Sequence, residues 1–212
     1  MTNDDQKYIS SISSASFFRG PVLELGGGYG GDTCREIVES KGLIYQATDM
    51  MMGPGVDFVA NFENGEGVQA LRDAGPFGTV LVLNVLEHTF DPIGILDNVL
   101  KVISDDGAIV FLTPAIWPIH NYPVDCCRLL PDWYRRFAET RGLKLLDETF
   151  QYVECGRVSD FRSNDQDNFP IPAYKTPLYR NYSRAIHKVF NTFGRGMLHS
   201  SHLAIAGVFV RS

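Results

Sequence analysis

The sequence contains no apolar run long enough for a membrane helix and no basic, apolar start. Its longest apolar stretches, such as residues 79–83, fall far short of the roughly 20 residues that a bilayer requires. Residues 1–6 are polar and acidic, and they lack the positive charge and the apolar segment of a secretory signal. We therefore expect a cytoplasmic protein without membrane insertion.

Cysteine is scarce, and its placement argues against a disulfide framework. Among the four cysteines, Cys126 and Cys127 are neighbours, Cys34 and Cys155 are distant, and no Cys-x-x-Cys pair occurs. In the absence of a secretory signal, reduced thiols are expected. No group of His, Cys, Asp and Glu has metal-ligand spacing along the chain, so the sequence predicts no metal site.

Basic residues are outnumbered, which argues against a nucleic-acid partner. The 212 residues include 19 Lys and Arg against 25 Asp and Glu, for a formal net charge of −6. Residues 168–212 differ, because they contain no acidic residue. This basic segment either faces an anionic substrate, a membrane surface or an acidic partner, or forms a solvated surface that balances the acidic body.

Short apolar runs alternate with helical patterns along most of the chain. The length favours a single domain over residues 1–212, and the ordinary composition excludes disordered, collagen-like and coiled-coil chains. The alternation predicts a Rossmann-like α/β three-layer sandwich with a mainly parallel sheet. Strands are expected at 21–25, 43–48, 56–60, 79–84, 108–112, 143–154 and 202–210, and helices at 32–40, 67–73, 93–103, 132–140 and 182–193.

Two segments lie outside this alternation. Residues 1–18 precede the first strand, and we expect them to form an N-terminal cap segment. Residues 156–199 separate the last two strands and are rich in Pro, Asn, Tyr and Arg. Long inserts in compact domains are usually functional, so this insert is expected to be a lid over the substrate pocket.

A glycine-rich loop follows the first strand and precedes a helix. Residues 24–31 have the order Glu-Leu-Gly-Gly-Gly-Tyr-Gly-Gly. Glycines allow a ligand to approach the backbone closely, and the helix start offers free N–H groups. Asp49 ends the second strand, where a carboxylate can accept hydrogen bonds from both hydroxyls of a ribose. Together these features predict a nucleotide-type cofactor at the carboxyl ends of the strands.

The glycines alone do not decide which cofactor binds. Gly26, Gly28 and Gly31 also satisfy the G-x-G-x-x-G pattern of dinucleotide sites. Glu24, however, would lie unfavourably against a pyrophosphate and favourably near a cationic amino-acid group. This acid favours S-adenosylmethionine, which has an ammonium group, a sulfonium group and no phosphate.

Residues 20–155 resemble the class I S-adenosylmethionine-dependent methyltransferases of the small-molecule type often called type 11. Glu24-x-Gly26-x-Gly28-x-Gly30 matches the acid-and-glycine loop of that family, and Asp49 matches its ribose-binding acid. The resemblance implies a seven-stranded sheet whose last strand is antiparallel, and an in-line attack of the acceptor on the methyl group.

The resemblance also extends to residues after the third and fourth strands. Asn61 stands where an acid usually contacts adenine, and Asn84-Val85-Leu86-Glu87-His88 resembles the segment beside the methionine part of the cofactor. The cofactor-binding residues that it implies are Glu24, Gly26, Gly27, Gly28, Gly30, Asp49, Met50, Asn61, Phe62, Asn84, Val85 and Leu86.

The loop after the fifth strand is the expected acceptor side. Its residues Tyr122-Pro123-Val124-Asp125-x-x-Arg128 resemble a stretch of many type 11 members, including some encoded near glycan genes. A hydroxyl acceptor gains from a base near the operating pH, and His88 and His120 are the candidates; Asp125 is the third catalytic candidate. Each of these histidines also fits a structural role, and Asp125 also fits an ion pair with Arg128.

We expect an S-adenosylmethionine-dependent methyltransferase, monomeric or homodimeric, that methylates a hydroxyl of a sugar, glycan precursor or secondary metabolite. A NAD(P)-dependent Rossmann oxidoreductase is the first alternative, although the chain has no Tyr-x-x-x-Lys pair. A non-catalytic scaffold that binds S-adenosylmethionine is the second. A nucleic-acid or protein methyltransferase is disfavoured, because the fourth strand is not followed by an Asn/Asp-Pro-Pro-Tyr string.

Overall fold

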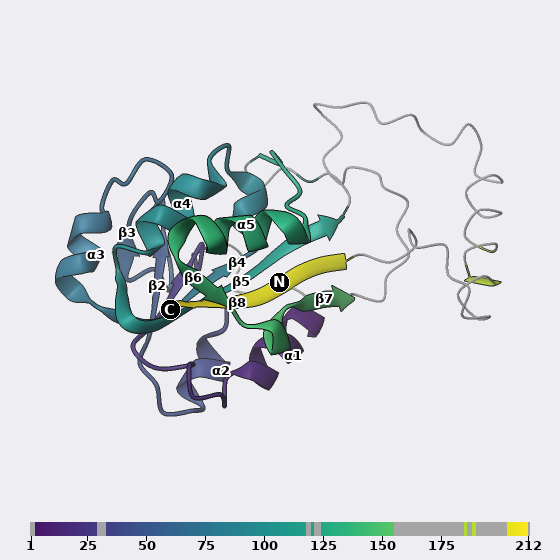
Figure 1. The fold of residues 1–212 in the computed structure, drawn as a ribbon. Helices are drawn as coiled ribbons and strands as arrows, with labels where there is room; N and C mark the ends of the chain where they lie inside the picture. Colours follow the sequence, from purple (N-terminus) through teal and green to yellow (C-terminus); the bar gives the residue numbers. More distant parts are fainter. Residues whose placement is uncertain are drawn as a thin grey trace.

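The computed structural model describes residues 3–28, 33–117, 120, 124–154, 185, 188–189 and 203–211. One mixed sheet forms the centre, and helices cover both of its faces (Figure 1). Across this described part of the chain, every helix is too short or too polar to span a bilayer.

The order of elements alternates strands and helices as the sequence predicts. The strands are β1 (Val22–Leu25), β2 (Tyr45–Asp49), β3 (Phe58–Val59), β4 (Phe77–Leu83), β5 (Ile103–Ile116), β6 (Leu143–Leu145), β7 (Gln151–Glu154) and β8 (Leu203–Arg211). The α-helices are α1 (Asn3–Ile12), α2 (Arg35–Glu39), α3 (Val68–Ala74), α4 (Pro92–Val99) and α5 (Pro131–Arg141), and the short 3₁₀-helices are η1 (Leu86–His88) and η2 (Asp147–Thr149).

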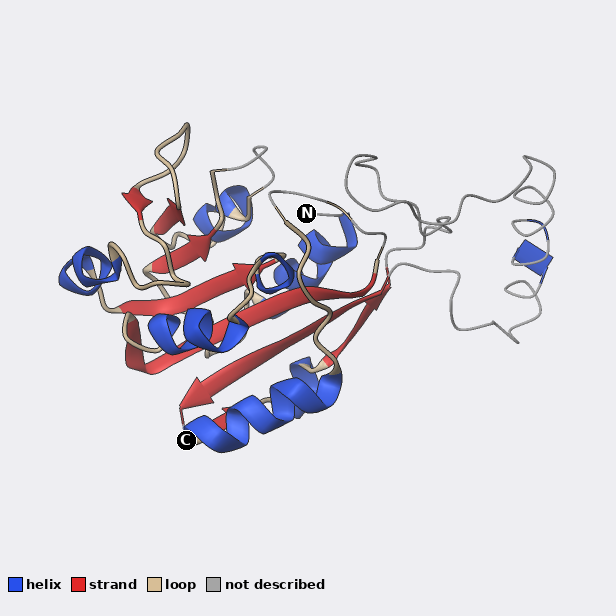
Figure 2. Cartoon of the chain, turned by 90° about the horizontal axis from the view of Figure 1, so that it is seen from above, coloured by secondary structure: helices blue, strands red, loops and turns tan. Residues whose placement is uncertain are grey.

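The sheet has the order β3-β2-β1-β4-β5-β8-β6, and β7 also pairs with β8. Strands β1 to β5 pair in parallel, whereas β8 is antiparallel to β5, β6 and β7. The predicted Rossmann-like sheet with an antiparallel last strand is therefore confirmed. Figure 2, viewed from above, shows the long strands β5 and β8 side by side.

The sheet has eight strands where seven are expected, because residues 143–154 form two strands. The helix η2 interrupts this stretch. The Thr149 hydroxyl donates to the Leu146 carbonyl at 2.8 Å and accepts from the Val208 amide at 3.1 Å. These bonds hold the interruption against β8, so that both short strands pair with the same neighbour.

Two apolar layers, one on each face, form the core. On one face, side chains of β1, β4 and β5 pack with α3, α4 and α5, and on the other face with α1 and α2. Successive side chains of β5 alternate between these layers, as strand geometry requires: Phe111 lies in the first and Leu112 in the second. The three-layer architecture follows from this alternation.

Stacked aromatic rings join α5 to the sheet. The Phe111 ring stacks on Tyr134 with centroids 4.3 Å apart, and Phe209 lies 4.6 Å from Phe111. Gly207, the register partner of Phe111, makes room for its ring, since a Cβ there would lie 2.6 Å from Phe111 Cζ. This cluster packs α5 onto β5 and β8.

The two segments outside the alternation differ in how far the structure describes them. In the N-terminal segment, α1 packs on the sheet face opposite α5, and the Tyr8 hydroxyl donates to the Thr149 carbonyl at 3.0 Å. The expected lid over residues 156–199 lies outside the described residues, apart from residues 185, 188 and 189.

Replacing Phe111 by Ala should lower the free energy of unfolding by about 3–5 kcal/mol, because it leaves a cavity among packed rings. Phe90→Ala is the matched control: that side chain is 93% exposed, and its loss should change stability by less than about 0.5 kcal/mol. Urea unfolding of both variants measures the difference. Equal stabilities would contradict the role assigned to the ring cluster.

Candidate functional site

The loops that follow β1, β2, β4 and β5 meet at one edge of the sheet. These four strands are neighbours and run parallel, so their carboxyl ends lie together. In open α/β sheets, ligands bind at this edge. The expected cofactor and acceptor residues belong to these loops, to the loop after β3, or to the ends of β1 and β2.

The glycine turn after β1 lies directly on β2. The amides of Gly26 and Gly27 donate to the Thr48 carbonyl at 2.8 and 3.2 Å, and Gly26 has a φ of 72°. A Cβ on Gly27 would lie 2.7 Å from Ala47 Cβ. Only glycine fits this approach, which keeps the backbone amides of the turn close to the sheet edge. Gly30 lies outside the described residues.

Asp49 stands at the end of β2, beside the glycine turn. Its Oδ2 accepts from the Gly28 amide at 3.3 Å, and its Oδ1 accepts from the Met51 amide at 3.4 Å. The carboxylate is half-buried, and Met50 next to it is exposed. The structure thus brings together the turn and the acid that the sequence predicts to bind one ligand.

The Glu24 carboxylate is buried at the centre of the site. Its Oε2 accepts hydrogen bonds from the Cys34 amide at 2.8 Å and from the Tyr45 hydroxyl at 2.7 Å. Burial raises the pKa of Glu24 despite these two bonds. Oε2 therefore joins β1 to the start of α2 and to β2, a structural role in addition to the expected ligand contact.

The residues after β3 form a turn. Asn61 Oδ1 accepts from the amides of Glu63 and Asn64 at 2.9 and 3.4 Å. The Phe62 side chain is buried in the core, and its carbonyl accepts from Asn98 Nδ2 at 2.6 Å. The side-chain oxygen of Asn61 thus holds the turn in shape. Its side-chain NH₂ group is the part that can face the adenine base of a cofactor.

Asn84 turns the chain sharply after β4. Among the described residues, it is the only non-glycine residue with a positive φ, at 53°. Asn tolerates this left-handed conformation better than most residues, and such strain is concentrated at functional sites. The turn places Val85 against the glycine loop, because its Cγ2 lies 3.4 Å from the Cβ position of Gly26. The segments after β1 and β4 therefore border one space.

Asp5, which belongs to none of the sequence motifs, also lies at this edge of the sheet. The helix α1 carries it to the carboxyl edge, where its side chain is 3% exposed and Asn84 Nδ2 approaches its Oδ2 at 3.5 Å. The sequence carries a signal for this burial: Asp5 shares one helical face with Tyr8, Ile9 and Ile12, all of them buried.

Glu87, which the sequence marks only as part of the motif after the fourth strand, lies on the expected acceptor side. Its peptide carbonyl accepts from the amides of Cys126 and Cys127 at 2.7 and 3.2 Å. Its side chain is fully buried, and neither carboxylate oxygen accepts a hydrogen bond from another described residue. Burial raises the pKa of this carboxyl group to about 8.

The structure brings His88 and His120 together. Their ring centroids lie 5.0 Å apart in an edge-to-face arrangement. His88 Nδ1 is hydrogen-bonded to the Val124 carbonyl, and its Nε2 lies 3.6 Å from Glu87 Oε1. Burial lowers the pKa of His88, which favours the neutral ring. The two candidate bases therefore share one place at the sheet edge.

The predicted ion pair between Asp125 and Arg128 is confirmed. Arg128 donates to both carboxylate oxygens through its two terminal nitrogens, and Asp125 Oδ2 also accepts from the His120 amide at 2.9 Å. Burial alone would raise the pKa of Asp125, but the bonds from Arg128 and His120 hold it below its usual value. Asp125 thus stays ionised and orients the His120 segment.

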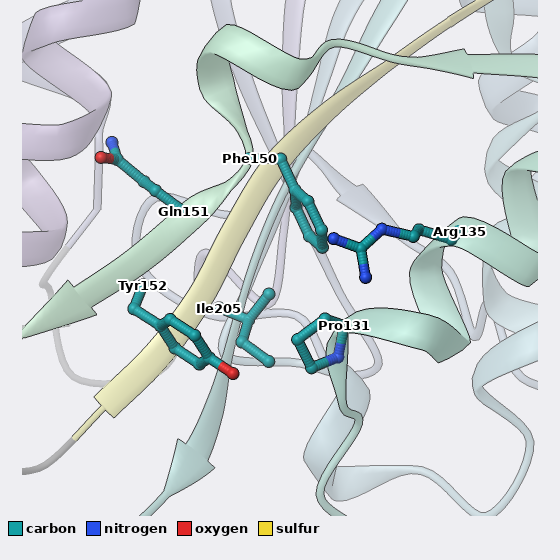
Figure 3. A pocket seen from close by; sticks show the side chains of 6 residues that line it. All are labelled: Pro131, Arg135, Phe150, Gln151, Tyr152 and Ile205. Atoms are coloured by element: carbon teal, nitrogen blue, oxygen red, sulfur yellow. The ribbon is translucent and has the colours of Figure 1, made fainter. Parts of the chain in front are cut away.

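A separate small cavity of about 110 Å³ opens between the start of α5, β7 and β8 (Figure 3). Arg135 lies over the Phe150 ring at its wall, 5.1 Å from the centroid. None of the predicted site residues borders this cavity, which is lined by Pro131, Arg135, Phe150, Gln151, Tyr152 and Ile205.

Comparison with known families assigns the chain to a class. A family model described as a methyltransferase domain matches residues 5–153, which is more than half of the chain. The chain therefore belongs to this methyltransferase family. No curated protein sequence matches it.

Solved structures with similar folds agree with this assignment. An S-adenosylmethionine-dependent methyltransferase from Archaeoglobus fulgidus is 14% identical, with a TM-score of 0.54 over 96% of this chain and 94% of the other. The 1,6-didemethyltoxoflavin N1-methyltransferase of Burkholderia thailandensis, bound to S-adenosylhomocysteine, is 14% identical. Its TM-score is 0.54, over 97% of this chain and 78% of the other. The [4+2]-cyclase SpnF is also 14% identical, with a TM-score of 0.53 over 97% of this chain and 81% of the other.

At these identities the likeness concerns the fold. The cyclase shows that this fold also supports a reaction other than methyl transfer. Family and fold together make the chain a class I methyltransferase, an enzyme class whose cofactor is S-adenosylmethionine. The cofactor predicted from the glycine turn and its neighbouring acids is therefore confirmed.

Gly28→Ala should weaken the binding of S-adenosylhomocysteine by about tenfold or more, equivalent to about 1.4 kcal/mol. The added Cβ would lie 2.5 Å from Val56 Cγ2 and 3.1 Å from Asp49 Oδ2, so that the turn and the acid must separate. Calorimetric titration measures the affinity. Gly53→Ala is the control, since nothing lies within 4 Å of its Cβ position, and it should bind normally. Equal affinities of the two variants would contradict this reading.

Proposed function

We propose that this single-domain chain transfers the methyl group of S-adenosylmethionine to a hydroxyl of a small acceptor, a sugar, glycan precursor or secondary metabolite. The observation that carries the proposal is the position of His88 and His120, paired at the sheet edge. The segment that bears His88 borders the glycine turn through Val85. This position supports a role for these histidines as a base beside the place where the cofactor would end.

The residues at the edge fit this cofactor. The glycine turn presents backbone amides, and Asp49 offers a carboxylate for ribose hydroxyls. Asp5, Glu24 and Glu87 are buried acids around the same space. When such acids ionise beside a bound cation they stabilise its positive charge, and they would disfavour a pyrophosphate. This charge pattern supports a sulfonium cofactor over a dinucleotide.

Bound S-adenosylmethionine supplies a methyl group on a positively charged sulfur, which is a good leaving group. Most of the catalytic task left to the protein is alignment of the acceptor, which can contribute several kcal/mol of the barrier. Asn84 and Val85 would hold the methionine part, and Asp49 the ribose. His88 and His120 would then activate the acceptor oxygen, with Asp125 as a positioning residue for His120.

Asp49→Asn should weaken S-adenosylhomocysteine binding about tenfold or more, because hydrogen bonds to a charged group contribute about 1.5–3 kcal/mol. Asp73→Asn is the matched control: that acid is exposed on α3 and bonds to Gln69. Titrations with NADH and NADPH are run in parallel. Binding of a nicotinamide dinucleotide in place of S-adenosylhomocysteine would contradict the proposed cofactor site.

The reaction itself is tested with panels of sugars, phenols and amines, with S-adenosylhomocysteine release as the measurement. Turnover is expected with hydroxyl acceptors. His88→Asn should lower kcat by roughly 10²–10⁴-fold, the usual contribution of an acid–base group, while S-adenosylhomocysteine affinity stays within about twofold. Asp73→Asn should react normally. Tight cofactor binding without turnover on any panel would favour the non-catalytic scaffold, and turnover on amines alone would contradict hydroxyl transfer.

A further inference from the structure

Three side chains at the sheet edge converge on one point. Glu87, His88 and His120 each offer a ligand atom, and these atoms lie within 4.8 Å of one another. Glu87 Oε1 and His88 Nε2 are 3.6 Å apart. Two ligands of a tetrahedral zinc ion, each about 2.1 Å from the metal, are separated by about 3.4 Å. The Glu87 and His88 atoms are close to this spacing, and His120 lies near enough to complete the set by a shift of its side chain.

Among the described residues, no other residue stabilises the Glu87 carboxyl group by a hydrogen bond. It is fully buried, and neither of its oxygens accepts a hydrogen bond from another described side chain or amide. Removing a carboxylate from water without partners is costly, so such a group in a folded protein calls for an explanation. An ion bound between Glu87 and the two histidines supplies one.

Both histidines are held as metal-binding histidines are held. His88 turns Nδ1 to the Val124 carbonyl, which leaves Nε2 on the side of Glu87. The His120 ring lies against Asp125, with Nδ1 3.4 Å from Oδ2. Metal-ligating histidines nearly always have such a carbonyl or carboxylate partner, which fixes the ring orientation. Arg128 in turn fixes Asp125.

We propose that Glu87, His88 and His120 bind a divalent transition-metal ion. Two imidazoles and one carboxylate suit Zn²⁺ and its first-row neighbours, whereas Mg²⁺ and Ca²⁺ prefer all-oxygen sites. Three protein ligands leave at least one coordination position open, as in catalytic zinc sites. The sequence does not predict this site, because its ligands come from the loops after two different strands.

The open position would face the acceptor, and this step rests on the proposed function. An acceptor hydroxyl that coordinates the ion loses its proton to solvent more readily. The oxygen then bonds to the methyl carbon as the carbon–sulfur bond breaks, and sulfur keeps the electron pair. His88 and His120 would thus activate the acceptor as metal ligands.

The test uses the full chain, treated with a chelator and then dialysed. Titration with ZnCl₂, followed by calorimetry and by metal analysis after gel filtration, should give one equivalent of bound zinc. MgCl₂ in parallel should give none. Glu87→Gln and His120→Asn should each weaken zinc binding by at least about 100-fold, the upper end of the effect of losing only an outer partner. Glu148→Gln, an exposed acid on η2, is the matched control and should bind like the wild type.

His120→Asn keeps the test valid if Glu87→Gln fails to fold, because His120 is only partly buried. Circular dichroism and S-adenosylhomocysteine titration of each variant report folding independently of the metal. The proposal is overturned if wild-type protein retains no zinc, if zinc binding survives both substitutions, or if Mg²⁺ binds as tightly as Zn²⁺. Zinc binding by a protein that binds no S-adenosylhomocysteine would reject the proposed function and keep the metal site, and the reverse result would reject only the metal.

Discussion

The loops after β4 and β5 become one site through the peptide carbonyl of Glu87. It accepts hydrogen bonds from the amides of Cys126 and Cys127, which join the short helix η1 to the segment before α5. The bond between His88 Nδ1 and the Val124 carbonyl adds a third link. Without these links, His88 would have no fixed relation to His120. The order of the sheet only brings the loops near each other, and the backbone bonds set their geometry.

The acidic character of this edge comes from the carboxyl groups that these links and their neighbours bury. They bury Glu87, while α1 and β1 bury Asp5 and Glu24 around the same space. Glu24 accepts from two internal donors, the Cys34 amide and the Tyr45 hydroxyl. Carboxylates in a low-dielectric setting favour positive ligands strongly. An edge of this kind suits a sulfonium cofactor and, on the acceptor side, a metal cation. The two proposals therefore depend on one electrostatic feature and differ in which of its acids each one uses.

The sequence predicted the parts of the site that are local in the chain. The glycine turn is recognisable because close backbone approach demands glycine. Asp49 is recognisable because an apolar run marks the strand that it ends. The meeting of Glu87 with His120 is a long-range result of two loops, and Asp5 arrives from a helix before the first strand. No spacing along the chain encodes such contacts. The division of residues 143–154 into two strands has a similar cause, because the bond from Val208 to Thr149 comes from β8.

Departures from ordinary folding rules are concentrated at this edge. Asn84 has a left-handed backbone, and the Glu87 carboxyl group accepts no hydrogen bond from another described residue. Away from the edge, strands alternate with helices. The helix α4 has Asp91 as its N-cap and Pro92 as its first residue, and α5 ends at Gly142. A sequence that satisfies local rules elsewhere keeps such costly features where function requires them. The Glu87 carboxyl group, buried beside two histidines without a hydrogen bond from another described residue, is thus the feature that points most strongly to a bound cation.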